Sequence, residues 1–181
     1  MDKKLLLVRK KNNVCTLILN RPEKQNSLSI ELIELLESTL NELAEDDAVR
    51  TVILRGAGDK AFCAGFDIGS LPIHSKGNMN ERLKALDPVE SLLQSLGSFP
   101  LPIIAMLNGL AFGLGCELAI CCDLRIGAKD IRMGMPPAKL GLVIHGLDCN
   151  VLFRALGCKV PKKCCLPAEL MRANESKNSD W

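Results

Sequence analysis

Two stretches of the sequence share one layout, and this layout restricts the fold more than any other feature. Each has a short apolar run rich in β-branched residues, then a turn of small residues, then a segment with helical character. The stretches are TVILRGAGDKAFCAGFDIGSL at residues 51–71 and LPIIAMLNGLAFGLGCELAICCD at residues 101–123. Short apolar runs bounded by glycine are typical of buried strands. Both stretches therefore predict a strand, a turn and a helix in that order.

Strands and helices alternate along the rest of the chain. Residues 15–20 (CTLILN), 51–56 and 101–109 have the pattern of strands. Residues 29–47 predict an amphipathic helix, with Ser29 as its N-cap. The apolar side chains of that helix fall on one stripe: Ile30, Ile33, Leu36, Leu40 and Leu43. This alternation predicts an α/β fold with a mostly parallel sheet.

Composition narrows the class of partner. The chain has 181 residues, a net charge of +2 and an aromatic fraction of 3%. We expect one domain with a real core, and neither a basic patch nor a stacking platform for nucleic acid. The apolar run LLLV at residues 5–8 is interrupted by Arg9, which makes it too short for a signal peptide or a membrane span. A soluble protein with no membrane or nucleic-acid partner is the expectation.

The cysteines point to a reducing compartment. Five of the nine cysteines lie in apolar surroundings: Cys15, Cys63, Cys116, Cys121 and Cys122. Buried free thiols of a cytoplasmic protein explain them best, so we expect a cytoplasmic location. A zinc site needs spaced Cys or His pairs, but the chain has no C-x-x-C and only two histidines, His74 and His145. We therefore expect no metal.

The two similar turns have a chemistry of their own. A strand-to-helix turn leaves backbone N–H groups unpaired at the start of the helix, and these groups attract negative charge. Neither turn matches the phosphate loop G-x-x-x-x-G-K-[ST] or the dinucleotide loop G-x-G-x-x-G. Two such turns that converged on one point would form an oxyanion hole. The alternative is that both turns are ordinary glycine-rich connections.

Four motifs, in this order and spacing, resemble the crotonase superfamily of enoyl-CoA hydratases and isomerases. The motifs are LNRPEKQNSLS, AFCAGFDI, PIIAMLNGLAFGLGCELAICCDLRIGA and GMPPAKLGL. The resemblance runs from about Leu5 to about Gly157. It implies a spiral of ββα units that binds acyl-CoA thioesters, with coenzyme A entering as part of the substrate and no other cofactor. It also implies a homo-oligomer of the trimer type.

The resemblance assigns roles to individual residues. The N–H groups of Phe66 and Leu114 would hold the thioester oxygen, and Glu117 would be a catalytic acid or base with a raised pKa. Leucine can serve at position 114 if its φ is negative, because only the backbone donates. The loop at Lys24–Asn26 would lie near the adenine of coenzyme A. The expected substrate-binding residues are Lys24, Ala64, Gly65, Phe66, Asp67, Ile68, Gly113, Leu114 and Gly115.

Two departures from the family pattern limit the expected chemistry. Hydratases of this family use a second glutamate, and Pro137 stands at that position here. Proline cannot titrate, which puts two-carboxylate hydration in doubt. The segment MPPAKLGL is similar to that of the methylmalonyl-CoA decarboxylase branch, with His145 as a substitute proton donor. We therefore keep decarboxylation open beside hydration and isomerisation.

The end of the chain is the second departure. Residues 1–157 read as the acyl-CoA-binding core, and residues 158–181 as a divergent or truncated tail, so that much of the family's C-terminal helical region is missing. The segment CKVPKKCCLPAEL stands where a helix is expected. A catalytically inactive binder of CoA esters, or a truncated remnant, is therefore a further alternative.

Overall fold

The computed structural model describes residues 4–70, 87–127, 129–134 and 171–172. Within these ranges it has nine strands, three α-helices and two 3₁₀ turns. The strands are β1 (Leu6–Lys11), β2 (Val14–Leu19), β3 (Thr51–Gly56), β4 (Ala61–Cys63), β5 (Ile103–Leu107), β6 (Leu110–Phe112), β7 (Leu124–Gly127), β8 (Arg132–Gly134) and β9 (Met171–Arg172). The helices are α1 (Ile30–Ala44), α3 (Asp87–Gly97) and α4 (Leu114–Cys121), and the 3₁₀ turns are η1 (Pro22–Lys24) and η2 (Ile68–Ser70).

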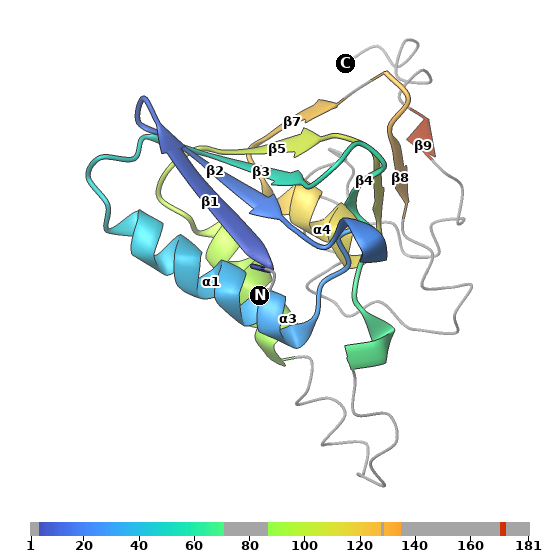
Figure 1. The fold of residues 1–181 in the computed structure, drawn as a ribbon. Coiled ribbons are helices and arrows are strands. Elements are labelled where there is room, and N and C mark those ends of the chain that lie inside the picture. Colours follow the sequence, from blue (N-terminus) through green and yellow to red (C-terminus); the bar gives the residue numbers. More distant parts are fainter. Residues whose placement is uncertain (1–3, 71–86, 128, 135–170, 173–181) are drawn as a thin grey trace, which may run out of the picture.

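The strands form two sheets, and both are mostly parallel, as the sequence predicts. The larger sheet has the order β1-β2-β3-β5-β7. Its first pair, β1 and β2, is antiparallel, and the remaining pairs are parallel. The smaller sheet has the order β4-β6-β8-β9, with only the β8–β9 pair antiparallel. Helices α1 and α3 lie on one side of the larger sheet, and α4 lies between the two sheets (Figure 1).

Helix α1 confirms the predicted cap and the predicted stripe. The Ser29 hydroxyl accepts a hydrogen bond from the Leu32 N–H at 3.4 Å. The helix ends at Ala44 rather than at residue 47. An Asp46 carboxylate oxygen accepts the Ala48 N–H at 2.9 Å, and such a local turn competes with continued helix. Of the predicted stripe, Ile30 is half-buried and the other four side chains are buried.

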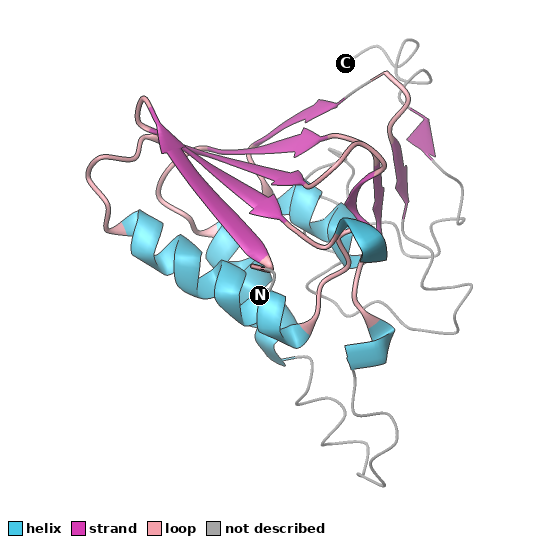
Figure 2. Cartoon of the chain, viewed as in Figure 1, coloured by secondary structure: helices cyan, strands magenta, loops and turns pink. Residues whose placement is uncertain are grey.

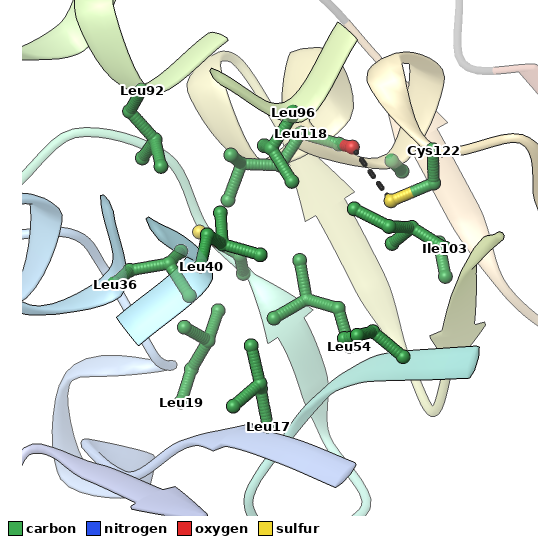
Figure 3. Close-up of a cluster of buried hydrophobic side chains, with 14 of the residues drawn as sticks. Leu17, Leu19, Leu36, Leu40, Leu54, Leu92, Leu96, Ile103, Leu118 and Cys122 are labelled. Atoms are coloured by element: carbon green, nitrogen blue, oxygen red, sulfur yellow. Dashed lines mark hydrogen bonds between the residues drawn. The ribbon is translucent and has the colours of Figure 1, made fainter. Parts of the chain in front are cut away.

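Helices α1 and α3 cover one face of the larger sheet (Figure 2), and buried apolar side chains of the sheet and the helices form the core. Alternate residues of β2, β3 and β5 are buried on that face, as the period of two in a strand requires. Figure 3 shows leucines from β2 and β3 and an isoleucine from β5 beside leucines from all three helices. The labelled contributors are Leu17, Leu19, Leu36, Leu40, Leu54, Leu92, Leu96, Ile103, Leu118 and Cys122. One continuous core therefore holds the sheet and α4 in a fixed relation.

Each of the two similar stretches contains two strands, not the single strand that the sequence predicts. The first stretch forms β3 and β4, and the second forms β5 and β6. The first strand of each joins the larger sheet and the second joins the smaller sheet, where β4 and β6 pair in parallel. The helix expected after the first turn is only η2. The second strands were missed because three residues are too few for a periodic signal.

Candidate functional site

The two turns that follow β4 and β6 lie against each other. Because β4 and β6 are parallel neighbours, their carboxyl ends reach the same edge of the smaller sheet. Gly65 sits there with φ of +105°, and a Cβ at this position would lie 2.8 Å from the Phe112 carbonyl oxygen and 3.5 Å from the Leu114 nitrogen. A Cβ at Gly115 would lie 2.2 Å from the Cys63 carbonyl oxygen. Any side chain at Gly65 or Gly115 would collide with the backbone of the other turn, so the close contact between the two turns depends on these glycines.

The first expected donor, the Phe66 N–H, belongs to the Gly65–Phe66 peptide, whose carbonyl group is hydrogen-bonded within the fold. The Gly65 carbonyl accepts the Leu28 N–H at 2.8 Å, and the Leu28 carbonyl accepts the Asp67 N–H at 2.8 Å. The described chain has no cis peptide bond. In a trans peptide the C=O and N–H point in opposite directions, so the Phe66 N–H points away from Leu28. Among the described residues it has no hydrogen-bond acceptor.

The second expected donor, the Leu114 N–H, is arranged in the same way. The Gly113 carbonyl accepts the N–H groups of Cys116 at 2.8 Å and Glu117 at 3.1 Å. The Leu114 N–H therefore points out of the N-terminal end of α4, and no acceptor for it lies within the described ranges. Gly113 takes the left-handed φ of +51° in this turn. Leu114 does not, so a leucine is unstrained as a backbone donor.

Glu117 lies three residues after Leu114 in the first turn of α4. Residues three apart share a helix face, so the side chains of Leu114 and Glu117 are on the same side of α4, in the turn that carries the Leu114 N–H. The residue is half-buried, unlike the buried residues Cys116 and Leu118 beside it. Burial and the nearby Glu117 carboxylate raise the pKa of Cys116 to about 11. The role of Glu117 as an acid or base, and the raised pKa expected for Glu117, stay predictions.

The other predicted binding residues follow the same edge. Ala64 is half-buried, and its N–H donates to the Gln25 carbonyl at 3.0 Å, which ties the first turn to the loop after β2. Lys24 is exposed at the end of η1 in that loop, and Ile68 is 53% exposed. The loop and the turn are therefore neighbours, as a ligand spanning from one to the other requires.

Two asparagines that the sequence analysis missed fix the geometry of this region. Asn26 is fully buried, and its amide group donates to the carbonyls of Ala57 at 3.0 Å and Ala61 at 2.8 Å. Asn108 donates to the same Ala61 carbonyl at 3.1 Å and accepts the Gly56 N–H at 3.0 Å. Asn26 has φ of +56°, a conformation that asparagine tolerates better than most residues. The sequence does show one asparagine in the loop after β2 and one in the turn after β5, and this was the signal that could have identified them.

An ion pair crosses from the loop after β2 to the first turn. The Arg21 guanidinium lies 2.7 Å from an Asp67 carboxylate oxygen, and the two side chains are 14% and 19% exposed. The Arg21 guanidinium holds the pKa of the Asp67 carboxyl below its usual range. The Asp67 carboxylate also accepts the Gly69 N–H at 3.2 Å, and the expected contact of Asp67 with substrate stays a prediction.

The cysteines of the described ranges are free thiols. Cys15, Cys63, Cys116 and Cys122 are buried and Cys121 is half-buried. Burial raises the pKa of Cys63 and of Cys122 to about 12, so both are inert thiols at neutral pH. No group of side chains able to hold a metal ion, and no helix fit to cross a membrane, occurs among the described residues. Pro137, His145 and most of the predicted tail lie outside those residues.

Comparison with known proteins decides the family. The profile of the enoyl-CoA hydratase/isomerase family matches residues 9–179. The chain belongs to this family. The match continues beyond Gly157, where the visible resemblance of the motifs ends. The crotonase fold expected from those motifs is confirmed, because solved enoyl-CoA hydratases superpose on the chain.

This enoyl-CoA hydratase/isomerase family member spans about half the length of some relatives. It is 32% identical to the human mitochondrial methylglutaconyl-CoA hydratase over 164 residues, which are 91% of this chain and 48% of that protein. It is 31% identical to the short-chain-enoyl-CoA hydratase of Clostridium acetobutylicum, covering 97% of this chain and 66% of that one. The crystal structure of the Bacillus anthracis enoyl-CoA hydratase matches with a TM-score of 0.85 and 31% identity, over 96% of this chain and 67% of that chain.

Proposed function

We propose that this chain binds acyl-CoA thioesters and stabilises their enolates between the N–H groups of Phe66 and Leu114. One observation carries the proposal: two adjacent peptides have their carbonyl groups bound within the fold and their N–H groups without an acceptor among the described residues. Two such donors on one oxygen form an oxyanion hole, which contributes on the order of 10²–10³-fold per donor. Family membership supports a thioester carbonyl as the group that is bound.

The proposed chemistry uses one proton carrier. Hydrogen bonds from both donors draw charge to the thioester oxygen, which stabilises an enolate formed at the α-carbon. Glu117, on the same face of α4 as Leu114, then gives or takes the α-proton. A β,γ-unsaturated acyl-CoA would thus lose its α-proton to Glu117 and form a dienolate. Glu117 would return the proton at the γ-carbon, which moves the double bond to the α,β position.

A second candidate reaction is decarboxylation of a malonyl-CoA derivative, and Pro137 favours it over hydration. Water addition needs a second positioned acid or base, and its loss costs about 10²–10⁴-fold. In decarboxylation the C–C bond breaks, carbon dioxide leaves, and the electron pair remains as the enolate, which then takes up one proton. Two relatives, the crotonyl-CoA hydratase of Syntrophomonas wolfei and the short-chain-enoyl-CoA hydratase of Clostridium acetobutylicum, support short acyl chains as the substrates to test.

The test is a panel of short acyl-CoAs with the purified chain. Binding is measured by calorimetry, and hydration, isomerisation and decarboxylation are followed separately. We expect saturable binding, slow or absent crotonyl-CoA hydration, and isomerisation that Glu117→Gln abolishes while Glu34→Gln, on the exposed face of α1, does not change it. Binding without turnover would reduce the chain to an inactive binder. No binding of any thioester would overturn the proposal.

We also propose that copies of this chain associate and that it works in the cytoplasm. On the face of the larger sheet, Met106 and Leu124 are 41% and 57% exposed, and Ile126, which pairs with Met106, is 60% exposed. An apolar strip of this kind supports contact between copies, and free thiols support a reducing compartment. Light scattering of the wild type and of Ile126→Glu tests the association, since the variant should be the smaller species.

A further inference from the structure

The Arg21 side chain joins the segment that carries the Phe66 donor to the segment that pairs with it at Leu28. One guanidinium nitrogen donates to the Ser27 carbonyl at 2.7 Å, and the other donates to the Asp67 carboxylate at 2.7 Å. Ser27 precedes Leu28, and Asp67 follows Phe66. The guanidinium therefore bridges Ser27 and Asp67, the residues next to the paired residues Leu28 and Phe66.

The pairing that Arg21 spans is weak by itself. Leu28 and Phe66 form an isolated bridge outside the two sheets. Within the described part of the chain, two bonds made by Leu28, at 2.8 Å each, set the direction of the Phe66 N–H. The Ala64 N–H, which donates to the Gln25 carbonyl at 3.0 Å, flanks the bridge on one side, and no strand of the described sheets continues the pairing. A planar two-armed donor that is 14% exposed supplies a further restraint, since charge-assisted bonds are stronger than neutral ones.

The backbone of Arg21 has a separate task. Its carbonyl accepts the N–H groups of Lys24 at 2.9 Å and Asn26 at 2.8 Å, and its N–H donates to the Asn26 side chain at 3.1 Å. These bonds shape the loop of η1, where Lys24 is expected to face the nucleotide end of coenzyme A. Any residue at position 21 other than proline can make them. The side chain and the backbone of Arg21 thus serve different ends of the ligand.

We propose that the Arg21 side chain is a positioning residue that aims the Phe66 N–H at the thioester oxygen, independently of coenzyme A recognition by the loop. The inference rests on the proposed function. It predicts a selective defect: loss of the guanidinium weakens recognition of the thioester carbonyl and leaves recognition of the rest of the ligand intact.

The experiment compares two ligands that differ only at the carbonyl. Butyryl-CoA carries the thioester oxygen, and S-butyl-CoA has a CH₂ group in its place. We expect the wild type to prefer butyryl-CoA by about threefold to tenfold, the worth of a typical hydrogen bond. Arg21→Met should lose most of this preference while its affinity for S-butyl-CoA stays within about twofold of the wild type. Lys10→Met, which breaks the exposed Lys10–Asp46 ion pair on β1, is the control and should keep the preference.

A second measurement reports the hydrogen bond directly. The infrared stretch of ¹³C-labelled butyryl-CoA carbonyl should move to lower frequency on binding to the wild type, and move less in Arg21→Met. Arg21→Lys keeps the charge but has one donor nitrogen in place of the planar fork that reaches both acceptors, so it should show an intermediate shift. It also serves as the test variant should Arg21→Met fail to fold.

Each outcome has a definite reading. If the Arg21 variants keep the wild-type preference and carbonyl shift, the inference is wrong while the proposed function stands. If they lose affinity for both ligands equally, Arg21 is a general structural residue and the inference is again wrong. If the wild type binds neither ligand, or binds both equally, the proposed oxyanion hole fails and the inference fails with it.

Discussion

Replacement of Gly115 by alanine tests whether the close contact between the two turns builds the site. Gly115 lies in the first turn of α4, beside the Leu114 donor. An added Cβ would lie 2.2 Å from the Cys63 carbonyl oxygen, 2.7 Å from the Cys63 Cβ and 2.8 Å from its carbonyl carbon. Two of these three atoms are backbone, so a rotamer change cannot relieve the contact. Helix α4 and strand β4 must move apart.

The structure sets the size of the effect. Ordinary contact would require a displacement on the order of 1 Å between two close-packed elements. Overpacking of this kind costs about 1–3 kcal/mol in the free energy of unfolding. For a chain of this length, the melting temperature should fall by roughly 2–12 °C. A 1 Å misplacement of the Leu114 N–H should also lower any turnover by about 10²-fold.

The assay combines thermal unfolding with calorimetric binding of butyryl-CoA. Gly97→Ala is the matched control, because nothing lies within 4 Å of a Cβ at the end of α3. This control should melt at or slightly above the wild-type temperature, since alanine favours helix over glycine. The reasoning is refuted if Gly115→Ala melts and binds butyryl-CoA as Gly97→Ala does.

Three further predictions test the surroundings of the site. Gly113→Ala has room for its Cβ but a φ of +51° with a ψ of −126°, so its destabilisation should reflect backbone strain alone, about 1–3 kcal/mol by urea unfolding. A null effect would contradict the assigned turn. Asn26→Ala should cost about 2–4 kcal/mol because buried backbone groups lose partners, whereas the exposed Asn41→Ala should be near neutral. Arg21 lowers the pKa of Asp67, so that stabilisation is present above about pH 4, the ordinary Asp range, and is lost as the pH falls through the lowered pKa. Asp67→Asn should be less stable than the wild type at pH 7 and lose less stability between about pH 4 and pH 2, and parallel pH profiles would refute this.

Local signals in the sequence were sufficient for the elements with a clear period. The stripe of α1 and its cap residue Ser29 follow from propensity and side-chain chemistry within a few residues, and the structure confirms both. The strands β2, β3 and β5 follow from short β-branched runs, to within two residues at each end. By contrast, β4 and β6 have three residues each, and their pairing partner lies about fifty residues away in the chain. No local pattern carries such a pairing.

The sequence by itself determined the α/β class and the two glycine turns, because each depends on residue type and near neighbours. The candidate donors Phe66 and Leu114 came from the resemblance of its motifs to the crotonase superfamily. Tertiary structure decided that these turns meet. It also brought Arg21 to Asp67, which is 46 residues away in the sequence, and Asn26 to Ala57 and Ala61, which are 31 and 35 residues away. No local pattern in the sequence indicated this pairing of Asp67 with Arg21. The physical reason is that the C=O and the N–H of one peptide point in opposite directions. The direction of the Phe66 N–H therefore depends on the group that binds the Gly65 carbonyl, and that group, the Leu28 N–H, is distant in the sequence.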